Sequence, residues 1–245
     1  IEARQKQYEY YRDMLLTFAE SGNTISRAEQ SRAEQSALIK LLQYVFGYVA
    51  LPLAEIFDTR NGYTPSKSKK EFWDSADIPW FRMEDIRENG RILSEATQYV
   101  SNSAVKGKAF PEKSIIISTS ATIGEHALIN VPFLANQRFT CLMMKKEYKD
   151  ILDIEYLFYY CFKLDNFCRE HLNQGNFASV DMKAFNTFEF CIPSIEKQKE
   201  TASILKRFDT LCNDLSEGLP AEIEARRKQY EYYRDKLLSF KELQK

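Results

Sequence analysis

The chain has 245 residues, of which 44% are hydrophobic, 13% aromatic and 28% charged. This composition is typical of a folded globular protein and excludes a disordered one, and the length suits one large domain or one medium-sized domain with extensions. No stretch approaches the roughly 20 apolar residues that cross a bilayer, and the chain starts with a charged run instead of the apolar core of a signal peptide. We therefore expect neither membrane insertion nor secretion.

The net charge and the cysteines exclude further classes of protein. The formal net charge of -1 lacks the strongly basic character of most nucleic-acid binders, so any DNA binding must depend on local patches. The five cysteines are odd in number and form no CxxC pair, which is typical of reduced thiols in a cytoplasmic protein. A zinc finger and a disulfide-linked scaffold are excluded.

An internal repeat marks both ends of the chain. Residues 1–16 return as residues 223–238 with only two differences. This separation is too long for the stacked repeats of a solenoid, so the two copies flank a single unit. Ile223, Tyr230 and Leu237 lie seven residues apart, which is the spacing of a coiled-coil seam. Both copies are therefore predicted to be helical.

Two features lie beside these flanking copies. A further helix is predicted over about residues 195–216, with a kink or short break at Gly218 and with Pro220 in the first turn of the next helix. The pentapeptide Ser-Arg-Ala-Glu-Gln occurs twice in succession at residues 26–35, and its composition favours helix. This tandem repeat is either a solvated polar helix face or a spacer, and the sequence leaves both possibilities open.

Between the flanks, short strand patterns alternate with Gly, Pro and Asn. The apolar β-branched run at residues 114–118 predicts a buried strand, and further strands are predicted at 125–130, 139–144 and 188–192. Residues 154–172 carry aromatic and aliphatic side chains at helical steps, which predicts a helix with a core-facing stripe. We therefore expect an α/β (α+β) globule bracketed by helices.

The residue patterns of common enzymes are missing. His126 and His171 lack metal-site spacing and have no nucleophile beside them in the sequence, which favours structural roles. Residues 102–109 fail the phosphate-loop pattern, because an asparagine replaces the first glycine and an alanine follows the lysine. Glu147-Tyr148-Lys149 is only an isolated nuclease-like triplet. We predict no catalytic residues and no metal site.

Three segments carry side chains suited to DNA. Residues 60–70 combine turns, hydroxyl groups and clustered positive charge, which suits phosphate contacts. Residues 136–138 place two amides and a guanidinium side by side, the groups that contact adenine and guanine in the major groove. Residues 174–183 form an amide-rich loop. An ordinary solvated surface is the alternative for each segment.

The charge balance favours specific over nonspecific contacts. Residues 48–192 hold 17 Lys and Arg against 19 Asp and Glu, which argues against charge-dominated binding. The predicted DNA contacts, chosen by their chemistry, are Arg60, Thr64, Ser66, Lys67, Lys69, Arg82, Ser120, Thr122, Asn136, Gln137, Arg138, Gln174, Asn176 and Lys183.

Five short motifs follow one another along the chain: Gly62-Tyr63-Thr64-Pro65-Ser66, Phe72-Trp73, Ile78-Pro79-Trp80-Phe81-Arg82-Met83-Glu84-Asp85-Ile86, Ser120-Ala121-Thr122-Ile123-Gly124, and Ile192-Pro193-Ser194-Ile195-Glu196-Lys197-Gln198-Lys199. Their order resembles the specificity subunit of type I restriction-modification systems. The resemblance covers about residues 48–243, and residues 1–18 resemble the end of the central helix of that family.

The resemblance implies a fold, partners and a function. Residues 47–193 would be a target-recognition domain that reads one half of a bipartite double-stranded DNA site. Residues 1–46 and 194–245 would be helical regions of an antiparallel coiled coil, which docks modification (methyltransferase) subunits; the restriction subunit joins that core. The specificity subunit has no catalytic role and no cofactor, since S-adenosylmethionine belongs to the partner methyltransferase.

The helices also carry more aromatic side chains than a coiled-coil seam needs. Their candidate methyltransferase contacts are Tyr8, Tyr11, Tyr230, Tyr233, Arg234 and Leu237, with coiled-coil packing as the alternative. Family members usually carry two recognition domains and this chain carries one. The resemblance therefore implies either the C-terminal half of a longer subunit or a half-subunit that forms a homodimer.

Two other functions compete with DNA recognition. A coiled-coil scaffold would organise partners without reading DNA, and changes at residues 136–138 would leave DNA selection unaltered. A stand-alone nuclease or methyltransferase would turn over its substrate without partners.

Overall fold

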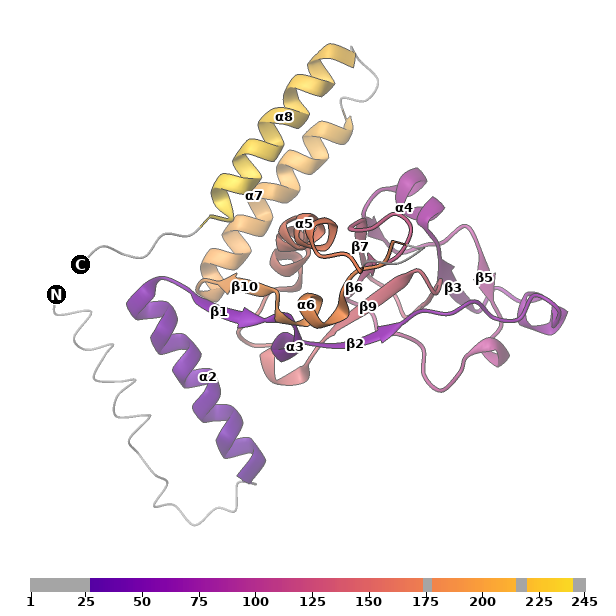
Figure 1. The fold of residues 1–245 in the computed structure, drawn as a ribbon, viewed down its shortest axis with the longest axis horizontal. Coiled ribbons are helices and arrows are strands. Elements are labelled where there is room, and N and C mark those ends of the chain that lie inside the picture. Colours follow the sequence, from indigo (N-terminus) through magenta and orange to yellow (C-terminus); the bar gives the residue numbers. More distant parts are fainter. Residues whose placement is uncertain (1–26, 174–177, 215–219, 240–245) are drawn as a thin grey trace. The chain divides into compact units, whose positions relative to one another are not determined.

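The computed structural model describes residues 27–173, 178–214 and 220–239, and the chain forms two compact units (Figure 1). The first, here called the helical unit, comprises Ile1–Leu51, Glu147–Asp153 and Cys191–Lys245. The second, here called the sheet unit, comprises Pro52–Lys146 and Ile154–Phe190. The chain therefore passes between the two units several times.

A five-stranded mixed sheet is the centre of the sheet unit. Its strands are, in spatial order, β2 (Phe57–Asn61), β9 (Phe139–Met144), β6 (Ser114–Ser118), β7 (His126–Ile129) and β4 (Ile92–Leu93). Neighbouring strands are antiparallel, except for the parallel pair β4 and β7. Figure 1 shows β9 between β2 and β6. Every residue of β6 is buried, as expected for a β-branched run in a central strand.

Smaller elements complete the sheet unit. A three-stranded sheet has the spatial order β5 (Tyr99–Val100), β3 (Ile78–Phe81) and β8 (Leu134–Ala135), in which β3 is antiparallel to β5 and parallel to β8. A separate pair consists of β1 (Val49–Pro52) and β10 (Glu189–Ile192), and the unit boundary falls within both strands. The short helices are α3 (Leu53–Ile56), α4 (Met83–Asn89), α6 (Met182–Thr187) and the 3-10 turns Lys70–Phe72, Asn102–Ala104 and Lys146–Tyr148.

The long aromatic helix α5 (Ile154–Glu170) packs against β7 and is buried over most of its surface. The predicted core-facing helix is therefore confirmed, although it ends before Leu172, whose side chain is exposed. Burial, reinforced by the charge of Asp165, raises the pKa of the Cys161 thiol and raises that of Cys168 to about 12. Neither thiol is a nucleophile at neutral pH.

A buried polar pair joins α5 to β7. The Nδ1 atom of His126 lies 2.8 Å from Oδ2 and 2.9 Å from Oδ1 of Asp165, and both side chains are buried. The rings of Phe158 and Phe162 flank the imidazole at centroid distances of 5.2 and 4.6 Å. His126 therefore has the structural role predicted for it.

The helical unit contains α2 (Arg27–Phe46), α7 (Ile195–Asp214) and α8 (Pro220–Leu237). α7 and α8 pack together, and the rings of Phe208 and Tyr233 stack with their centroids 6.0 Å apart. The predicted helix before Gly218 and the helix start at Pro220 are confirmed. Gly218 itself and the N-terminal repeat copy lie outside the described residues.

Two buried glutamines hold the described part of the helical unit together. Gln43 of α2 donates from its amide nitrogen to the carbonyls of Pro193 (2.9 Å) and Ile192 (3.3 Å). Gln198 of α7 donates to the carbonyls of Pro193 (2.8 Å) and Ile151 (2.9 Å), while its amide oxygen accepts from the N–H of Asp153 (2.9 Å). Because the Gln198 side chain is fully buried, these bonds replace all of its contacts with water.

Most of the longer predicted elements are confirmed. Strands lie where the sequence predicts them in β6, β7, β9 and β10, and α2 contains the tandem pentapeptide from Arg27 onward. The predicted domain boundaries at residues 47 and 193 stay a prediction. Among the described residues, no helix is both long and apolar enough to span a membrane.

Replacing Gln198 tests the role of this buried amide. We expect Gln198→Ala to lower the free energy of unfolding by about 2 to 5 kcal/mol, because it removes the bonds of Gln198 with the half-buried N–H of Asp153 and with the carbonyl of Ile151. The carbonyl of Pro193 keeps its bond from Gln43. Urea unfolding of both proteins measures the difference. The neighbouring exposed Lys199→Ala is the control, with an expected change of at most about 0.5 kcal/mol. Equal effects of the two changes would contradict the assigned role.

Candidate nucleic-acid interface

The topology of the five-stranded sheet gathers several loops at one edge. β2 and β6 end there, at Asn61 and Ser118, while their antiparallel neighbours β9 and β7 begin there. The connected loops are residues 61–66, 119–125 and 136–138. Residues 178–183 join them, since the N–H of Val180 donates to the carbonyl of Thr119 at 3.0 Å. We call these four segments the loop edge.

A chain of polar side chains fixes the strand ends beneath the loop edge. The Thr140 hydroxyl donates to Oδ1 of Asn61 at 3.0 Å and lies 2.9 Å from the hydroxyl of Thr119. These three residues lie on β9, on β2 and directly after β6. The link sets the relative positions of the three strands from which the loops project.

Gly62 permits an unusually close approach between two of the loops. Its N–H donates to the carbonyl of Phe139 (2.9 Å), and the next N–H, of Tyr63, donates to the carbonyl of Ala135 (2.7 Å). A Cβ atom at position 62 would lie 2.3 Å from the carbonyl oxygen of Asn136 and 2.4 Å from that of Ala135. Only glycine fits between these backbone groups, which explains the glycine of the first motif.

Aromatic residues of the next two motifs anchor the same loop. The indole N–H of Trp80 donates to the carbonyl of Tyr63 at 3.0 Å, and that of Trp73 donates to the carbonyl of Ser66 at 3.2 Å. The two indole rings meet edge to face with their centroids 5.2 Å apart. The Tyr63 hydroxyl donates in turn to the carbonyl of Ala104. The loop is therefore held along its length by the three-stranded sheet and its neighbours.

The turn at residues 136–138 combines a fixed backbone with an exposed tip. The Oδ1 atom of Asn136 accepts from the N–H of Arg138 at 3.1 Å, and its backbone N–H donates to the carbonyl of Phe81 at 2.9 Å. Gln137 and Arg138 are exposed, and the amide oxygen of Gln137 accepts a hydrogen bond from the hydroxyl of Thr64. Asn136 thus shapes the turn, while Gln137 and Arg138 face solvent.

The loop between β6 and β7 is shaped by left-handed backbone conformations. Ala121 has a φ of 66° and Gly124 a φ of 90°, and a Cβ atom at Gly124 would lie 2.9 Å from the carbonyl oxygen of Asp165. Ser120 bridges to Ser179 of the neighbouring segment. The hydroxyl of Thr122 is buried and has no hydrogen-bond partner among the described residues. Both predicted contacts, Ser120 and Thr122, are half-buried.

Several predicted basic contacts already interact within the sheet unit. Arg60 donates to the carbonyl of Lys108 at 2.8 Å and lies 4.0 Å from the ring centroid of Phe110. The half-buried Arg82 lies over the Trp80 ring and 4.0 Å from the Glu84 carboxylate.

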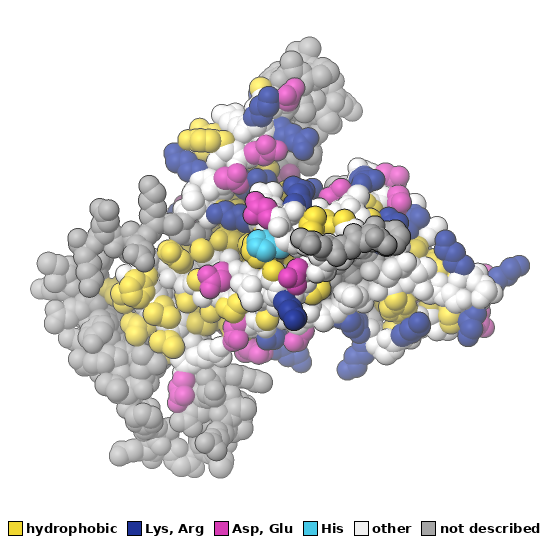
Figure 2. Space-filling view, viewed as in Figure 1, with side chains coloured by type: hydrophobic (Ala, Val, Ile, Leu, Met, Phe, Trp, Pro, Cys, Tyr) yellow, Lys and Arg dark blue, Asp and Glu magenta, His cyan; other side chains and the backbone are white. Residues whose placement is uncertain are grey.

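Other predicted contacts are exposed or lie outside the described residues. Lys67, Lys69, Ser66 and Lys183 are exposed. Of these, Ser66 shares a hydrogen bond with the Ser68 hydroxyl at 2.8 Å, and the ammonium of Lys69 lies 3.9 Å from the Glu71 carboxylate and 5.0 Å from the ring centroid of Phe72. Figure 2 shows Lys and Arg side chains around the part of the sheet unit that carries β3 and β5. Gln174, Asn176, Tyr8 and Tyr11 lie outside the described residues.

On the helices, the predicted partner contacts differ in exposure. Tyr230 and Arg234 are each only 9% exposed, and Leu237 is half-buried. Tyr233 is 38% exposed, while Tyr232 is 62% exposed and was not predicted. The seven-residue spacing predicted the burial of Tyr230 but not that of Leu238, and the coiled-coil seam stays a prediction.

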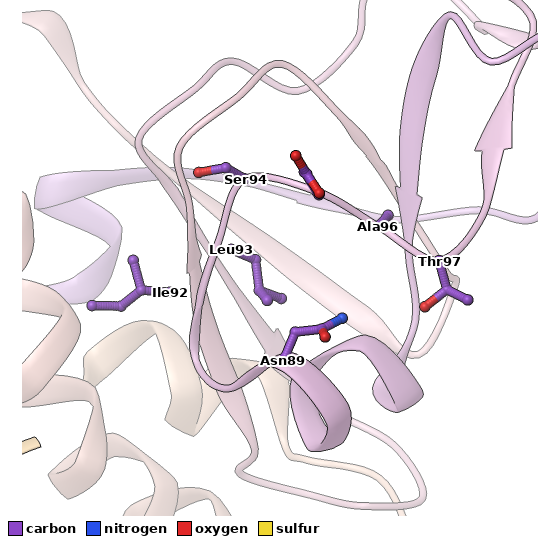
Figure 3. Close-up of a pocket in the computed structure, with 7 residues that line it drawn as sticks. Asn89, Ile92, Leu93, Ser94, Ala96 and Thr97 are labelled. Atoms are coloured by element: carbon purple, nitrogen blue, oxygen red, sulfur yellow. The ribbon is translucent and has the colours of Figure 1, made fainter. Parts of the chain in front are cut away.

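Two hollows in the described part of the sheet unit lack the residues of a catalytic site. A hollow of about 400 Å³ beside α4 and β4 is lined by Asn89, Leu93, Thr97 and neighbouring residues, with Glu95 as its one ionisable side chain (Figure 3). A second hollow, of about 350 Å³, is lined by Lys67, Lys70, Trp73, Asp74 and Gln98. Within the described ranges, no group of three or more His, Cys, Asp or Glu is placed to hold a metal ion.

Comparison with known proteins adds independent information. A family model described as "Type I restriction modification DNA specificity domain" matches residues 47–225. The chain is 58% identical over 200 residues to the type I restriction enzyme EcoprrI specificity subunit of Escherichia coli, covering 78% of this chain and 50% of the relative. It is 35% identical over 250 residues to the EcoR124I/EcoR124II specificity subunit of the same organism, covering 98% and 54%. The chain spans about half the length of these curated relatives.

Solved structures share the fold. The HsdS subunit from Thermoanaerobacter tengcongensis matches with a TM-score of 0.54 at 15% identity, over 97% of this chain and 55% of that one. A chain from a study of complex assembly and conformational transition of the type I R-M system matches with a TM-score of 0.56 at 16% identity, over 97% and 57%. The predicted mixed α/β fold is confirmed.

Adding one methyl group at Gly62 tests the close approach of the two loops. We expect Gly62→Ala to lower the free energy of unfolding by about 3 kcal/mol or more, because the new Cβ meets backbone atoms that have no room to move aside. Gly90→Ala is the control, since its Cβ has open space and it carries only the backbone cost of a positive φ, about 1 to 2 kcal/mol. Chemical denaturation compares the two, and a smaller loss for Gly62→Ala than for Gly90→Ala would contradict the prediction.

Proposed function

Because the chain belongs to the DNA specificity family of type I restriction-modification systems, we propose that it reads one half of a bipartite double-stranded DNA target through the loop edge. The observation that carries this proposal is the convergence of four polar loop segments on one edge of a firmly packed sheet. Binding residues are commonly carried by loops that a rigid scaffold positions, and the sheet and its hydrogen-bonded strand ends would be that scaffold.

The specificity subunit is the non-catalytic component of such systems. The buried thiols, whose pKa values are raised by burial, agree with this role in the described part of the chain. S-adenosylmethionine is proposed to bind the partner methyltransferase and not this chain.

The helical unit is proposed to serve assembly. We assign residues 47–193 to the target-recognition domain, and residues 1–46 and 194–245 to helical regions that form an antiparallel coiled coil and dock the methyltransferase subunits. The packing of α7 against α8 and the exposed Tyr232 and Tyr233 support this assignment. The restriction subunit would join indirectly, and pairing of two copies through the helices would supply the second half-site. The assembly would act in the cytoplasm.

The near-zero net charge favours reading by shape and base contacts with help from a partner. The whole chain carries 34 Lys and Arg against 35 Asp and Glu, so neutralising DNA phosphates cannot alone provide strong binding. A partner methyltransferase that also contacts the duplex would add the missing phosphate contacts. DNA binding by this chain is therefore expected to depend on the partner.

Selection from a randomised duplex library tests the proposed function. The protein, with and without its methyltransferase partner, is incubated with the library, and the bound DNA is sequenced. We expect enrichment of a short half-site that is stronger with the partner present, and a two-fold related pair of half-sites would indicate dimerisation. A folded, partner-bound protein that enriches no sequence would contradict the proposal and support the coiled-coil scaffold.

A further inference from the structure

The hydrogen-bonding groups at the loop edge differ in how much of their capacity the fold already uses. A side chain whose donors and acceptors are satisfied within the protein must break those bonds before it binds a base, whereas an unused group binds without that cost. The fold therefore separates side chains that build the surface from side chains that can read DNA.

Among the arginines in this region, Arg138 is distinct. The guanidinium of Arg60 donates to a carbonyl and covers a phenylalanine ring, and that of Arg82 lies over Trp80 near the Glu84 carboxylate. The guanidinium of Arg138 has no hydrogen bond, ion pair or ring contact within the part of the chain that the structure describes, and its side chain is exposed. All five of its donors are thus available.

The backbone that carries Arg138 is well fixed. Its N–H donates to Oδ1 of Asn136 and its carbonyl accepts from the N–H of Thr119 at 3.1 Å. The next residue, Phe139, is buried and begins β9. Because this backbone is already fixed, binding has to order only the side chain, which limits the loss of conformational entropy. The fixed backbone also defines the positions that the guanidinium can reach.

The neighbouring Gln137 is oriented by Thr64. The Thr64 hydroxyl donates to the amide oxygen of Gln137, so the amide nitrogen is the group left without a hydrogen-bond partner among the described residues. A glutamine that reads adenine by two bonds must accept from N6 with the amide oxygen while donating to N7. The Thr64 bond occupies one of the two lone pairs of the amide oxygen and turns the amide, whereas both N–H donors of the amide nitrogen are unused among the described residues, so donation is the role we assign to Gln137.

We propose that Arg138 and Gln137 are specificity-determining residues and that Thr64 is a positioning residue for Gln137. Both readers present donors, so they select acceptor groups in the major groove: O6 and N7 of guanine for Arg138, and a purine N7 or thymine O4 for Gln137. The half-site is therefore expected to contain a guanine next to a position where acceptors are preferred. Asn136, which unlike Gln137 is half-buried and whose Oδ1 accepts from the backbone of the turn, is assigned to the turn and not to base reading. This inference rests on the proposed function.

The competing role for Arg138 is a phosphate contact, and a charge-conserving change distinguishes the two. Lysine keeps the positive charge and can still contact guanine, but it lacks the planar fork with which a guanidinium makes two parallel bonds. A phosphate contact would survive Arg138→Lys and would affect all sequences equally in Arg138→Ala, whereas a base contact is weakened in Arg138→Lys and lost in Arg138→Ala.

The experiment repeats the library selection with the methyltransferase-bound wild type and with Arg138→Lys, Arg138→Ala, Gln137→Ala and Thr64→Val. Lys113→Ala is the charge control, because Lys113 is exposed and precedes β6 at the opposite edge of the sheet. Circular dichroism melting checks that each variant folds as the wild type does. Binding to an enriched duplex and to an unrelated duplex is then measured across salt concentrations.

We expect Arg138→Ala to lose about 5- to 150-fold of the preference for one guanine, the range for a two-bond base contact, and Arg138→Lys to lose part of that preference. Arg138→Lys should keep the wild-type affinity for unrelated DNA and its salt dependence. Thr64→Val should broaden selection at the adjacent position, as Gln137→Ala does, without changing the guanine preference. Lys113→Ala should leave the selected sequence unchanged.

Three results would overturn the inference while leaving the proposed function intact. They are a wild-type half-site without a guanine, an unchanged half-site in Arg138→Ala, and a Thr64→Val variant that selects as the wild type does although Gln137→Ala does not. Failure of the wild type itself to enrich any sequence would instead contradict the proposed function.

Discussion

The contact between the backbone at Gly62 and the carbonyls of Ala135 and Asn136 is the constraint on which the candidate interface depends. It brings together two loops that are more than 70 residues apart in the chain. Because no side chain separates them, Thr64 reaches Gln137. Trp80 of β3 and Trp73 donate hydrogen bonds to carbonyls of the same loop. A larger residue at position 62 would separate the parts of the surface that must act together.

Buried polar groups set geometry in both units. In the helical unit, the amides of Gln43 and Gln198 bind the carbonyls of Ile192 and Pro193, and in the sheet unit His126 and Asp165 join α5 to β7. Apolar packing tolerates small shifts, whereas a buried hydrogen bond is satisfied in only a few arrangements. These pairs therefore contribute to a single well-defined placement of helices and loops.

The sequence predicted the elements with a clear local signal and missed those that depend on distant partners. The run of β-branched residues in β6 predicts a strand, and the aromatic residues at helical spacing in α5 predict a helix, because each pattern extends over several residues. β5 and β8 have two residues each, too few to show a period. The side-chain chemistry of Arg60 and Asn136 suggested DNA contacts, but the fold uses part of their hydrogen-bonding capacity internally. Arg60 bonds with Lys108, a partner that no local pattern could reveal.

The alternation of the chain between the two units affects how target preference can change by recombination. An exchanged segment that carries the complete sheet unit, residues 52–190, necessarily brings along Glu147–Asp153, which belongs to the helical unit. In the recipient protein, this short segment must place a carbonyl and an N–H where those of Ile151 and Asp153 bond to Gln198 in the present chain. Compatibility between an exchanged sheet unit and the helical unit that receives it thus depends on a few backbone atoms that lie outside the four loop segments.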